Sequence, residues 1–170
     1  DSLPAIALGV DRASEGLMDR PPRESNKSFF AGGLWGRILS QGVFMAALTL
    51  VSYYIGANVY GAGAEGTTMA FITLAAVQLF HVFNIKRGSG SVLSSHTFDN
   101  PLLIISSVVP LLLLVPIIHI PAVAAVFGVA AITAAEWAIA LGLAFAVIPA
   151  VEIQKLISRA ASRVAARSQS

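Results

Sequence analysis

Four long runs without a charged residue constrain this chain more than any other feature. They cover residues 38–58, 67–85, 101–120 and 137–151, and the last and shortest lies between Glu136 and Glu152. About 20 apolar residues in a helix cross the roughly 30 Å hydrocarbon core of a bilayer. Backbone groups in lipid must be paired within the protein, which favours helices over irregular segments. The sequence therefore predicts an all-α, polytopic transmembrane helix bundle.

Composition excludes an ordinary soluble domain. Hydrophobic residues make up 56% of the chain, charged residues 12%, and the mean hydropathy is +0.77, whereas soluble domains carry about 25% charged residues. Cysteine is absent, so disulfide frameworks and thiolate metal sites are excluded. Because the chain opens with Asp-Ser-Leu-Pro and has no initiator Met, we expect it to be a piece of a longer protein.

The eleven Lys and Arg residues fall into three segments, which predicts the topology. Five precede or begin the first run, two follow the second run, four follow the fourth, and none lies in 56–66 or 121–135: Arg12, Arg20, Arg23, Lys27, Arg37; Lys86, Arg87; Lys155, Arg159, Arg163, Arg167. Cytoplasmic loops carry the excess of positive residues. We therefore expect a multi-pass protein of the cell membrane, in contact with the lipid bilayer, and no nucleic-acid partner.

Asp1 and Pro4 form the first candidate site. A proline removes the helical hydrogen bond to the carbonyl four residues earlier, so for Pro4 an unpaired oxygen would lie directly before the Asp1 carboxylate. Hard cations such as calcium bind carboxylate and carbonyl oxygens, and interrupted helices form ion sites in transporters. Taken alone, the pattern favours Asp1 as a capping residue at the start of a loop helix.

Residues 1–10, followed by Met-Asp-Arg-Pro-Pro-Arg at 18–23, resemble the sixth transmembrane helix and following cytoplasmic loop of P-type cation-transporting ATPases. They are especially similar to bacterial calcium pumps of the sarco/endoplasmic reticulum type, and residues 70–84 resemble the eighth span of that family. The resemblance implies that 1–10 end the sixth helix and 11–33 form a cytoplasmic loop. Residues 34–155 would then hold the seventh to tenth helices, and 156–170 a basic cytoplasmic tail.

The same resemblance implies two ligands for the transported metal ion. Asp1 takes the position of the cation-binding aspartate of the sixth span, and Gln78 takes the position of a glutamate ligand in the eighth. Glutamine keeps an oxygen but lacks the charge, which resembles single-site calcium pumps. Sodium/potassium pumps also carry glutamine in this region, and Gln78 alone fits a hydrogen bond between helices equally well. His81 and Asn84, at three-residue steps beyond it, are expected to hydrogen-bond to neighbouring helices.

The function implied for the parent protein is a P-type ATPase that exports calcium from the cytoplasm. Ca²⁺ would be the transported ion, and ATP and Mg²⁺ would act only in the parent's cytoplasmic domains. The four aspartates are followed by Ser, Arg, Arg and Asn, so none begins the phosphorylated Asp-Lys-Thr-Gly-Thr motif. No catalytic or cofactor-binding residue is therefore expected here. The expected partners are the remaining transmembrane helices and cytoplasmic domains of the pump.

Two alternatives remain open: a sodium/potassium- or proton-type pump of the same superfamily, and a non-catalytic membrane scaffold. Three further segments carry expectations. The loop 11–33 either docks on the parent's phosphorylation domain or is a solvated connector. The tail 155–167 is either a basic amphipathic helix along the membrane surface or a solvated helix end. Small residues recur every four positions at Ala134, Ala138, Gly142, Ala146 and Ala150, which predicts packing against another span.

Overall fold

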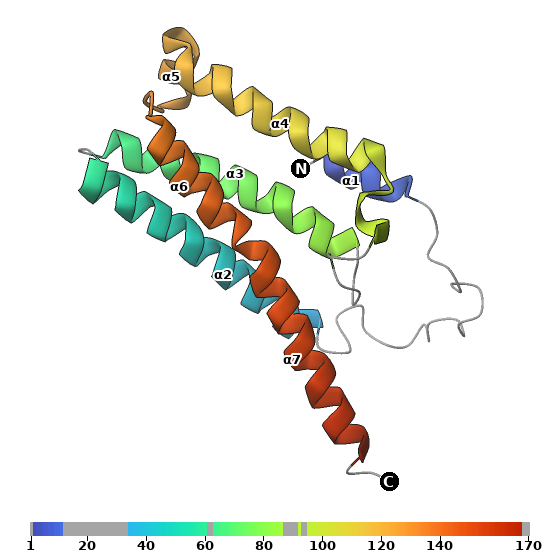
Figure 1. Cartoon of the computed structure of the whole chain (residues 1–170). Coiled ribbons are helices and arrows are strands. Elements are labelled where there is room, and N and C mark those ends of the chain that lie inside the picture. The colour runs from blue at the N-terminus through green and yellow to red at the C-terminus, as the bar shows by residue number, and fades with distance from the viewer. Residues whose placement is uncertain (1, 12–33, 61–62, 87–91, 93–94, 168–170) are drawn as a thin grey trace.

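The computed structural model describes residues 2–11, 34–60, 63–86, 92 and 95–167. These residues form helices and, within the described ranges, no strand (Figure 1). The all-α prediction is confirmed. In chain order the elements are α1 (Ser2–Gly9), α2 (Leu34–Ile55), the π-helical turn η1 (Gly56–Tyr60), α3 (Ala64–Lys86), the 3₁₀ turn η2 (Ser95–Phe98), α4 (Pro101–His119), α5 (Pro121–Phe127), α6 (Ala134–Phe145) and α7 (Val147–Arg167).

Four helical segments among the described residues are long and apolar enough to cross a membrane: Leu34–Tyr60, Ala64–Lys86, Pro101–His119 and Ala134–Ala160. They contain the four uncharged runs, except that the third helix ends one residue before its run does, and the chain is a multi-pass membrane protein. The first and last segments are longer than predicted. Their extra turns hold polar and charged residues, including Arg37 and Lys155, which a helix can carry where it leaves the hydrocarbon.

The bundle has two ends, which we call the Lys86 end and the α5 end. At the Lys86 end, α3 ends, α4 begins, and Asp11 after α1 forms an ion pair of 3.4 Å with Lys86. At the α5 end, α2 ends, α3 begins, and α5 joins the end of α4, away from the Lys86 end (Figure 1). Successive spans run in opposite directions between these ends. The first span therefore begins, and the fourth span ends, on the side of the Lys86 end.

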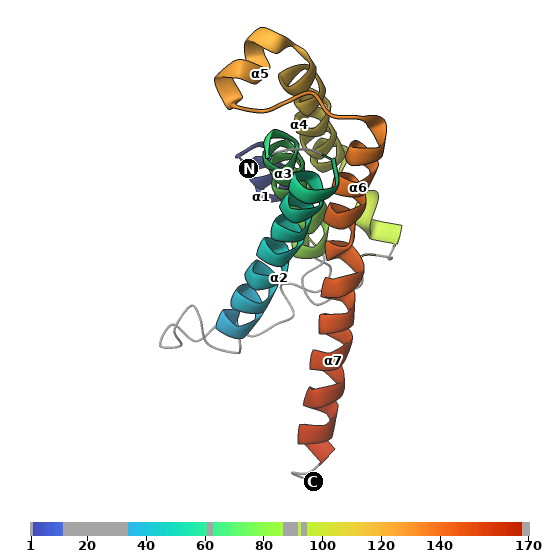
Figure 2. The same cartoon turned by 90° about the vertical axis from the view of Figure 1, so that its left-hand side faces the viewer.

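The third helix, α3, is the centre of the bundle. Half of the residues in the membrane-spanning stretch of α3 are buried inside the structure, whereas only 6% are buried in the span that contains α2. The reason is that α3 packs against α1, α2, α4, α6 and α7. Two apolar clusters follow its length: Met69 and Ile72 pack with Leu114 and Ala140, and further along Ala76 and Val77 pack with Ala144, Val147 and Val151. The outer face of α2 is largely exposed in this chain (Figure 2).

Two glycines bring the backbones of α2 and α3 into direct contact at the α5 end. A Cβ on Gly56 would lie 2.6 Å from the Cα of Gly66, and a Cβ on Gly66 would lie 2.8 Å from the carbonyl oxygen of Tyr53. Neither glycine has space for a side chain. The π-helical turn η1 begins at Gly56, and such a turn changes the direction of the backbone locally. The two glycines therefore fix the α2–α3 hairpin.

The last span is interrupted at Ala146, between α6 and α7. Pro149 lacks the N–H that would bond to the carbonyl of Phe145, whereas the Ala146 N–H keeps its helical bond to the Gly142 carbonyl oxygen and also bonds to that of Leu143, each at 3.2 Å. Beyond this point α7 continues in nearly the same direction and ends past the other helices (Figures 1 and 2). The expected helix is present, but it projects from the bundle and does not bend onto the bundle's end, because no Gly or Pro follows Pro149.

The predicted stripe of small residues does not form the packing face of α6 within this chain. Ala134, Ala138 and Gly142 are exposed, whereas Ala140 and Ala144 are fully buried against α3. A four-residue step turns by about 40° around a helix, since each residue turns by about 100°. The five small residues therefore do not share one face of the helix. The packing face is formed instead by Ala140 and Ala144.

Candidate functional site

The short helix α1 lies between α3 and α4 with one side buried. Ala7 is fully buried and packs with Val82 of α3 and Leu103 of α4. The side chain of Asn100 donates a hydrogen bond of 3.0 Å to the Ala7 carbonyl oxygen and accepts one of 3.1 Å from the Leu103 N–H. One residue thus caps α4 and holds α1 in place. Pro4 is also buried.

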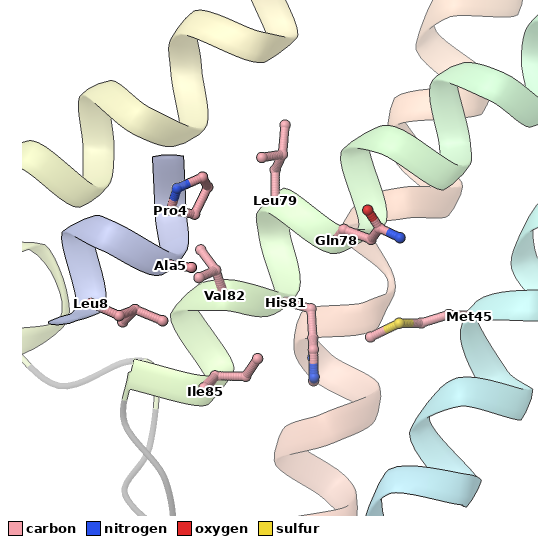
Figure 3. A pocket seen from close by; sticks show the side chains of 9 residues that line it. All are labelled: Pro4, Ala5, Leu8, Met45, Gln78, Leu79, His81, Val82 and Ile85. Atoms are coloured by element: carbon pink, nitrogen blue, oxygen red, sulfur yellow. The ribbon is translucent and has the colours of Figure 1, made fainter. Parts of the chain in front are cut away.

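A cleft of about 310 Å³ opens between α1, α2 and α3 (Figure 3). Most of its walls are apolar, and the polar side chains that line it come from α3. The lining residues are Pro4, Ala5, Leu8, Met45, Gln78, Leu79, His81, Val82 and Ile85. The cleft therefore joins the proline-containing helix to the polar side of the central helix.

Gln78 is exposed and extends from α3 toward the side of the cleft on which Met45 lies (Figure 3). Its amide carries one oxygen acceptor and two N–H donors. The alternative role considered for Gln78, a hydrogen bond to a neighbouring helix, is not seen among the contacts of the described residues. The other predicted ligand, Asp1, lies outside the described residues; α1 begins at the next residue, Ser2.

His81 and Asn84 do not make the expected side-chain hydrogen bonds. Within the described part of the chain, the buried Nδ1 of His81 and both polar side-chain atoms of Asn84 have no hydrogen-bond partner. Instead, the neighbouring helix reaches the main chain: the Lys155 ammonium donates to the Asn84 carbonyl oxygen at 3.3 Å. A long lysine side chain can reach a carbonyl near the end of a helix, which a sequence pattern of polar side chains does not reveal.

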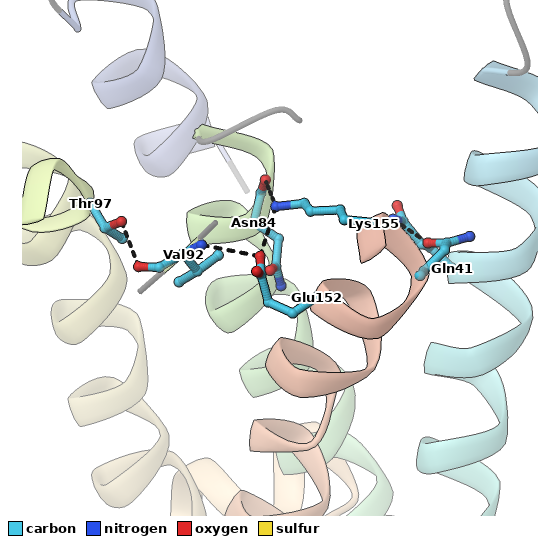
Figure 4. A network of polar contacts seen from close by, with 7 residues as sticks. Gln41, Asn84, Val92, Thr97, Glu152 and Lys155 are labelled. Atoms are coloured by element: carbon cyan, nitrogen blue, oxygen red, sulfur yellow. Dashed lines mark hydrogen bonds and ion pairs between the residues drawn. The ribbon is translucent and has the colours of Figure 1, made fainter. Parts of the chain in front are cut away.

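A polar network surrounds this contact at the Lys86 end (Figure 4). Glu152 and Lys155 form an ion pair, with Nζ and Oε1 3.1 Å apart. The Val92 N–H also donates to Glu152 Oε1 at 3.1 Å, and Thr97 donates to the Val92 carbonyl oxygen at 2.6 Å. The network ties α7 both to the end of α3 and to the α3–α4 connection. Apart from the Glu152–Lys155 spacing, nothing in the sequence indicated it.

A second polar contact joins α7 to α2 at the same end. The Gln41 amide donates to the side-chain oxygen of Gln154 at 2.8 Å, and the Gln154 amide donates to the Ser40 hydroxyl. No group of three or more His, Cys, Asp or Glu residues that could hold a metal ion occurs among the described residues. Calcium takes six to eight oxygen ligands, so Gln78 could supply one of several.

Comparison with known proteins decides the family. A family model described as cation transporting ATPase, C-terminus, matches residues 1–157. The chain belongs to this family. As a cation-transporting ATPase C-terminus, it is similar to calcium-transporting ATPase 1 of Bacillus cereus, with 33% identity over 94% of this chain and 20% of the relative. The expected resemblance is confirmed.

Two other relatives of this cation-transporting ATPase C-terminus extend the comparison. A calcium-transporting ATPase of Listeria monocytogenes is 33% identical over 92% of this chain and 18% of the relative. An endoplasmic reticulum-type calcium-transporting ATPase 3 of Arabidopsis thaliana is 27% identical over 94% of this chain and 19% of the relative. The chain spans about a fifth of the length of these relatives.

Proposed function

We propose that this chain is the C-terminal membrane region of a P-type ATPase that exports calcium from the cytoplasm. The printed names of the relatives support calcium as the transported ion. The observation that carries the proposal is the exposed Gln78 amide in the cleft beside the Pro4 helix. ATP and Mg²⁺ would act in cytoplasmic domains of the full-length pump, and phosphorylation there would switch the affinity of the membrane site.

In this proposal Asp1 and Gln78 both supply oxygen ligands to Ca²⁺. A carboxylate and an amide oxygen are both ligands that calcium accepts. The apolar walls of the cleft would strengthen the attraction between cation and carboxylate, because electrostatic interactions are stronger away from water. With an uncharged Gln78, the described part of the site adds no second negative charge, which favours one bound Ca²⁺ over two.

The Lys86 end would face the cytoplasm. Arg37, Lys86, Lys155 and Arg159 lie at this end, and positive residues mark cytoplasmic segments. The cleft and the exposed face of α2 would then receive the remaining transmembrane helices of the pump. The proposed coupling role of the loop 11–33 stays a prediction: of that loop only Asp11 lies within the described residues, where it pairs with Lys86.

The test is ATP hydrolysis by the full-length pump as a function of free Ca²⁺. We expect Asp1→Asn to raise the Ca²⁺ concentration for half-maximal activity on the order of tenfold or more, because ligand charge sets calcium affinity. Ser2→Ala, which changes the next residue and removes only an exposed hydroxyl, is the matched control. An Asp1→Asn pump with unchanged calcium dependence would refute the ligand assignment.

A sodium- or proton-coupled pump is the second candidate, because an uncharged glutamine suits a weaker cation site. The same assay separates the two. Hydrolysis that depends on Na⁺ or on pH, with no dependence on Ca²⁺, would favour the second candidate. A full-length protein without any ion-dependent ATP hydrolysis would instead favour a scaffold.

A further inference from the structure

The α4–α6 connection, residues 120–133, is apolar up to the capping residue Thr133, although it lies at an end of the bundle. None of the thirteen residues between His119 and Thr133 has a polar side chain. Several of its large side chains are exposed: Val126 by 83%, Phe127 by 52% and Ile120 by 47%. Val126 and Phe127 are neighbours in the sequence, and soluble surfaces rarely carry large exposed apolar patches.

Two contacts place the connection alongside α3, not beyond its end. The Phe127 ring lies 6.2 Å from the Phe71 ring, centroid to centroid, and the Ala130 N–H donates to the Thr68 hydroxyl at 2.8 Å. Phe71 is seven residues into α3 from Ala64, which at 1.5 Å per residue is about 10 Å along the helix. Phe127 at the end of α5 therefore lies beside α3 at a level about two turns inside its first residue.

The register between α3 and α6 gives the level of this contact relative to a tryptophan. Thr73 donates to the Ala140 carbonyl oxygen at 3.3 Å, so these residues, 67 positions apart, lie level. The same offset places Phe71 level with Ala138, next to Trp137. Tryptophan is enriched where a span meets the headgroups, and the Trp137 ring is stacked on His119 at the end of α4. Phe127 thus lies at the depth of an interfacial residue.

The non-helical part of the connection has protein partners for its backbone. The Val129 N–H bonds to the Ala124 carbonyl oxygen, the Ala130 N–H to Thr68, and the Thr133 N–H to the Glu136 carboxylate at 2.7 Å. Irregular backbone is tolerated at membrane depth only where protein groups satisfy it. Gly128, with φ of 65°, makes the left-handed turn that ends α5.

We propose that the connection 120–133 is seated in the lipid interface of the leaflet at the α5 end. The exposed side chains of Ile120, Val126 and Phe127 contact phospholipid acyl chains, and the segment anchors α4 and α6 at that depth. Interfacial helices bury an apolar face to this depth in a bilayer. The inference depends on the position of the contacts in the bundle and is independent of the pump activity proposed above.

The experiment uses the full-length pump in phospholipid vesicles, with any cysteines outside this chain replaced. Since this chain has no cysteine, Val126→Cys introduces one thiol at the most exposed position of the connection. A charged, membrane-impermeant maleimide is applied to both faces of the membrane. In a parallel sample, the thiol carries a bimane label and the vesicles contain doxyl-labelled phospholipid.

Ala64→Cys is the matched control, because Ala64 is the exposed first residue of α3 at the same end of the bundle and precedes the charged Glu65. We expect the thiol of Val126→Cys to react on the order of tenfold more slowly than that of Ala64→Cys, because an apolar environment disfavours the thiolate. Its bimane should be quenched by the doxyl lipid. Equal reaction rates would overturn the proposal, and so would a slow reaction without lipid quenching, which would show that protein covers the segment.

Discussion

The ammonium group of Lys155 on α7 lies 3.3 Å from the main-chain carbonyl oxygen of Asn84, close to the end of α3. The last four carbonyl groups of a helix have no partner within the helix, and a cation near them is favourable. Lys155 is only 7% exposed and also pairs with Glu152 at 3.1 Å. The last span therefore fastens the central helix at the Lys86 end.

Replacing Lys155 with Met should destabilise the pump. The change leaves the Asn84 carbonyl oxygen and one partner position of Glu152 unsatisfied, at a cost of about 1–3 kcal/mol for each buried polar group. The measurement is the midpoint of detergent unfolding with SDS, compared with Ser158→Ala one turn along the exposed side of α7. A midpoint equal to that of Ser158→Ala would contradict a structural role for the lysine.

The double variant Glu152→Gln, Lys155→Met should lose less free energy of unfolding than the two single variants lose together. Each single change leaves a partner behind, whereas the double change removes both charges together, and residues in contact do not contribute additively. The quantity to report is the interaction free energy from the four unfolding midpoints. Strict additivity would mean that the 3.1 Å pair contributes no coupling.

Gly66→Ala should disrupt the α2–α3 hairpin. The added methyl would lie 2.8 Å from the Tyr53 carbonyl oxygen and 2.9 Å from the Ala57 Cβ, and overpacking of this kind costs about 1–3 kcal/mol. Gly142→Ala is the control, since its Cβ would have nothing within 4 Å. Thermal unfolding of the two variants should give a lower Tm for Gly66→Ala only; similar values would show that the helices can separate freely.

Asn100 should affect α4 and α1 through different atoms. Asn100→Asp keeps the oxygen that caps Leu103 but loses the donor to the Ala7 carbonyl oxygen, whereas Asn100→Ala loses both bonds of 3.1 and 3.0 Å. Loss of a helix cap costs about 1 kcal/mol. If α1 carries the ion ligand, both variants should raise the Ca²⁺ concentration for half-maximal ATP hydrolysis. Only Asn100→Ala should also lose the cap of α4. Unchanged calcium dependence in both would separate the α1 contact from ion binding.

If Gln78 is a calcium ligand as proposed, Gln78→Ala should remove one oxygen ligand and raise the Ca²⁺ concentration for half-maximal ATP hydrolysis several-fold; roughly tenfold corresponds to about 1.4 kcal/mol. Gln78→Glu should change the number of ions bound, since a carboxylate adds a charge to the site. Leu74→Ala, one turn away on the exposed side of α3, is the control. If Leu74→Ala and Gln78→Ala shift the activation curve equally, Gln78 acts through packing and not as a ligand.

The spans were predictable because hydropathy reflects a single physical demand, the absence of charge over about 20 residues in lipid. The same pattern does not give the ends of a span. Arg37 lies in the first turn of α2, and the run that ends before Glu152 continues as helix α7. The break at Ala146 had a signal in Pro149, which removes a helical hydrogen bond.

The contacts around the cleft could be predicted only in part. Gln78 was identified through its resemblance to a ligand position, and the structure places it on a cleft with Pro4. The bond from Asn100 to Ala7 joins residues 93 positions apart, and no local pattern specifies such a pair. The contact of Lys155 with a main-chain carbonyl group is likewise invisible in a sequence, because every residue carries that group.

The two glycines at the α5 end limit how this protein can move. Backbones that touch without side chains between them cannot slide past each other without a steric clash, because neither Gly56 nor Gly66 has space even for a Cβ. In a transport cycle of the pump proposed above, α2 and α3 should therefore tilt together as a rigid pair. Spin labels at one position on each of these spans should keep a constant separation in every state of the cycle, while distances from either label to α4 change.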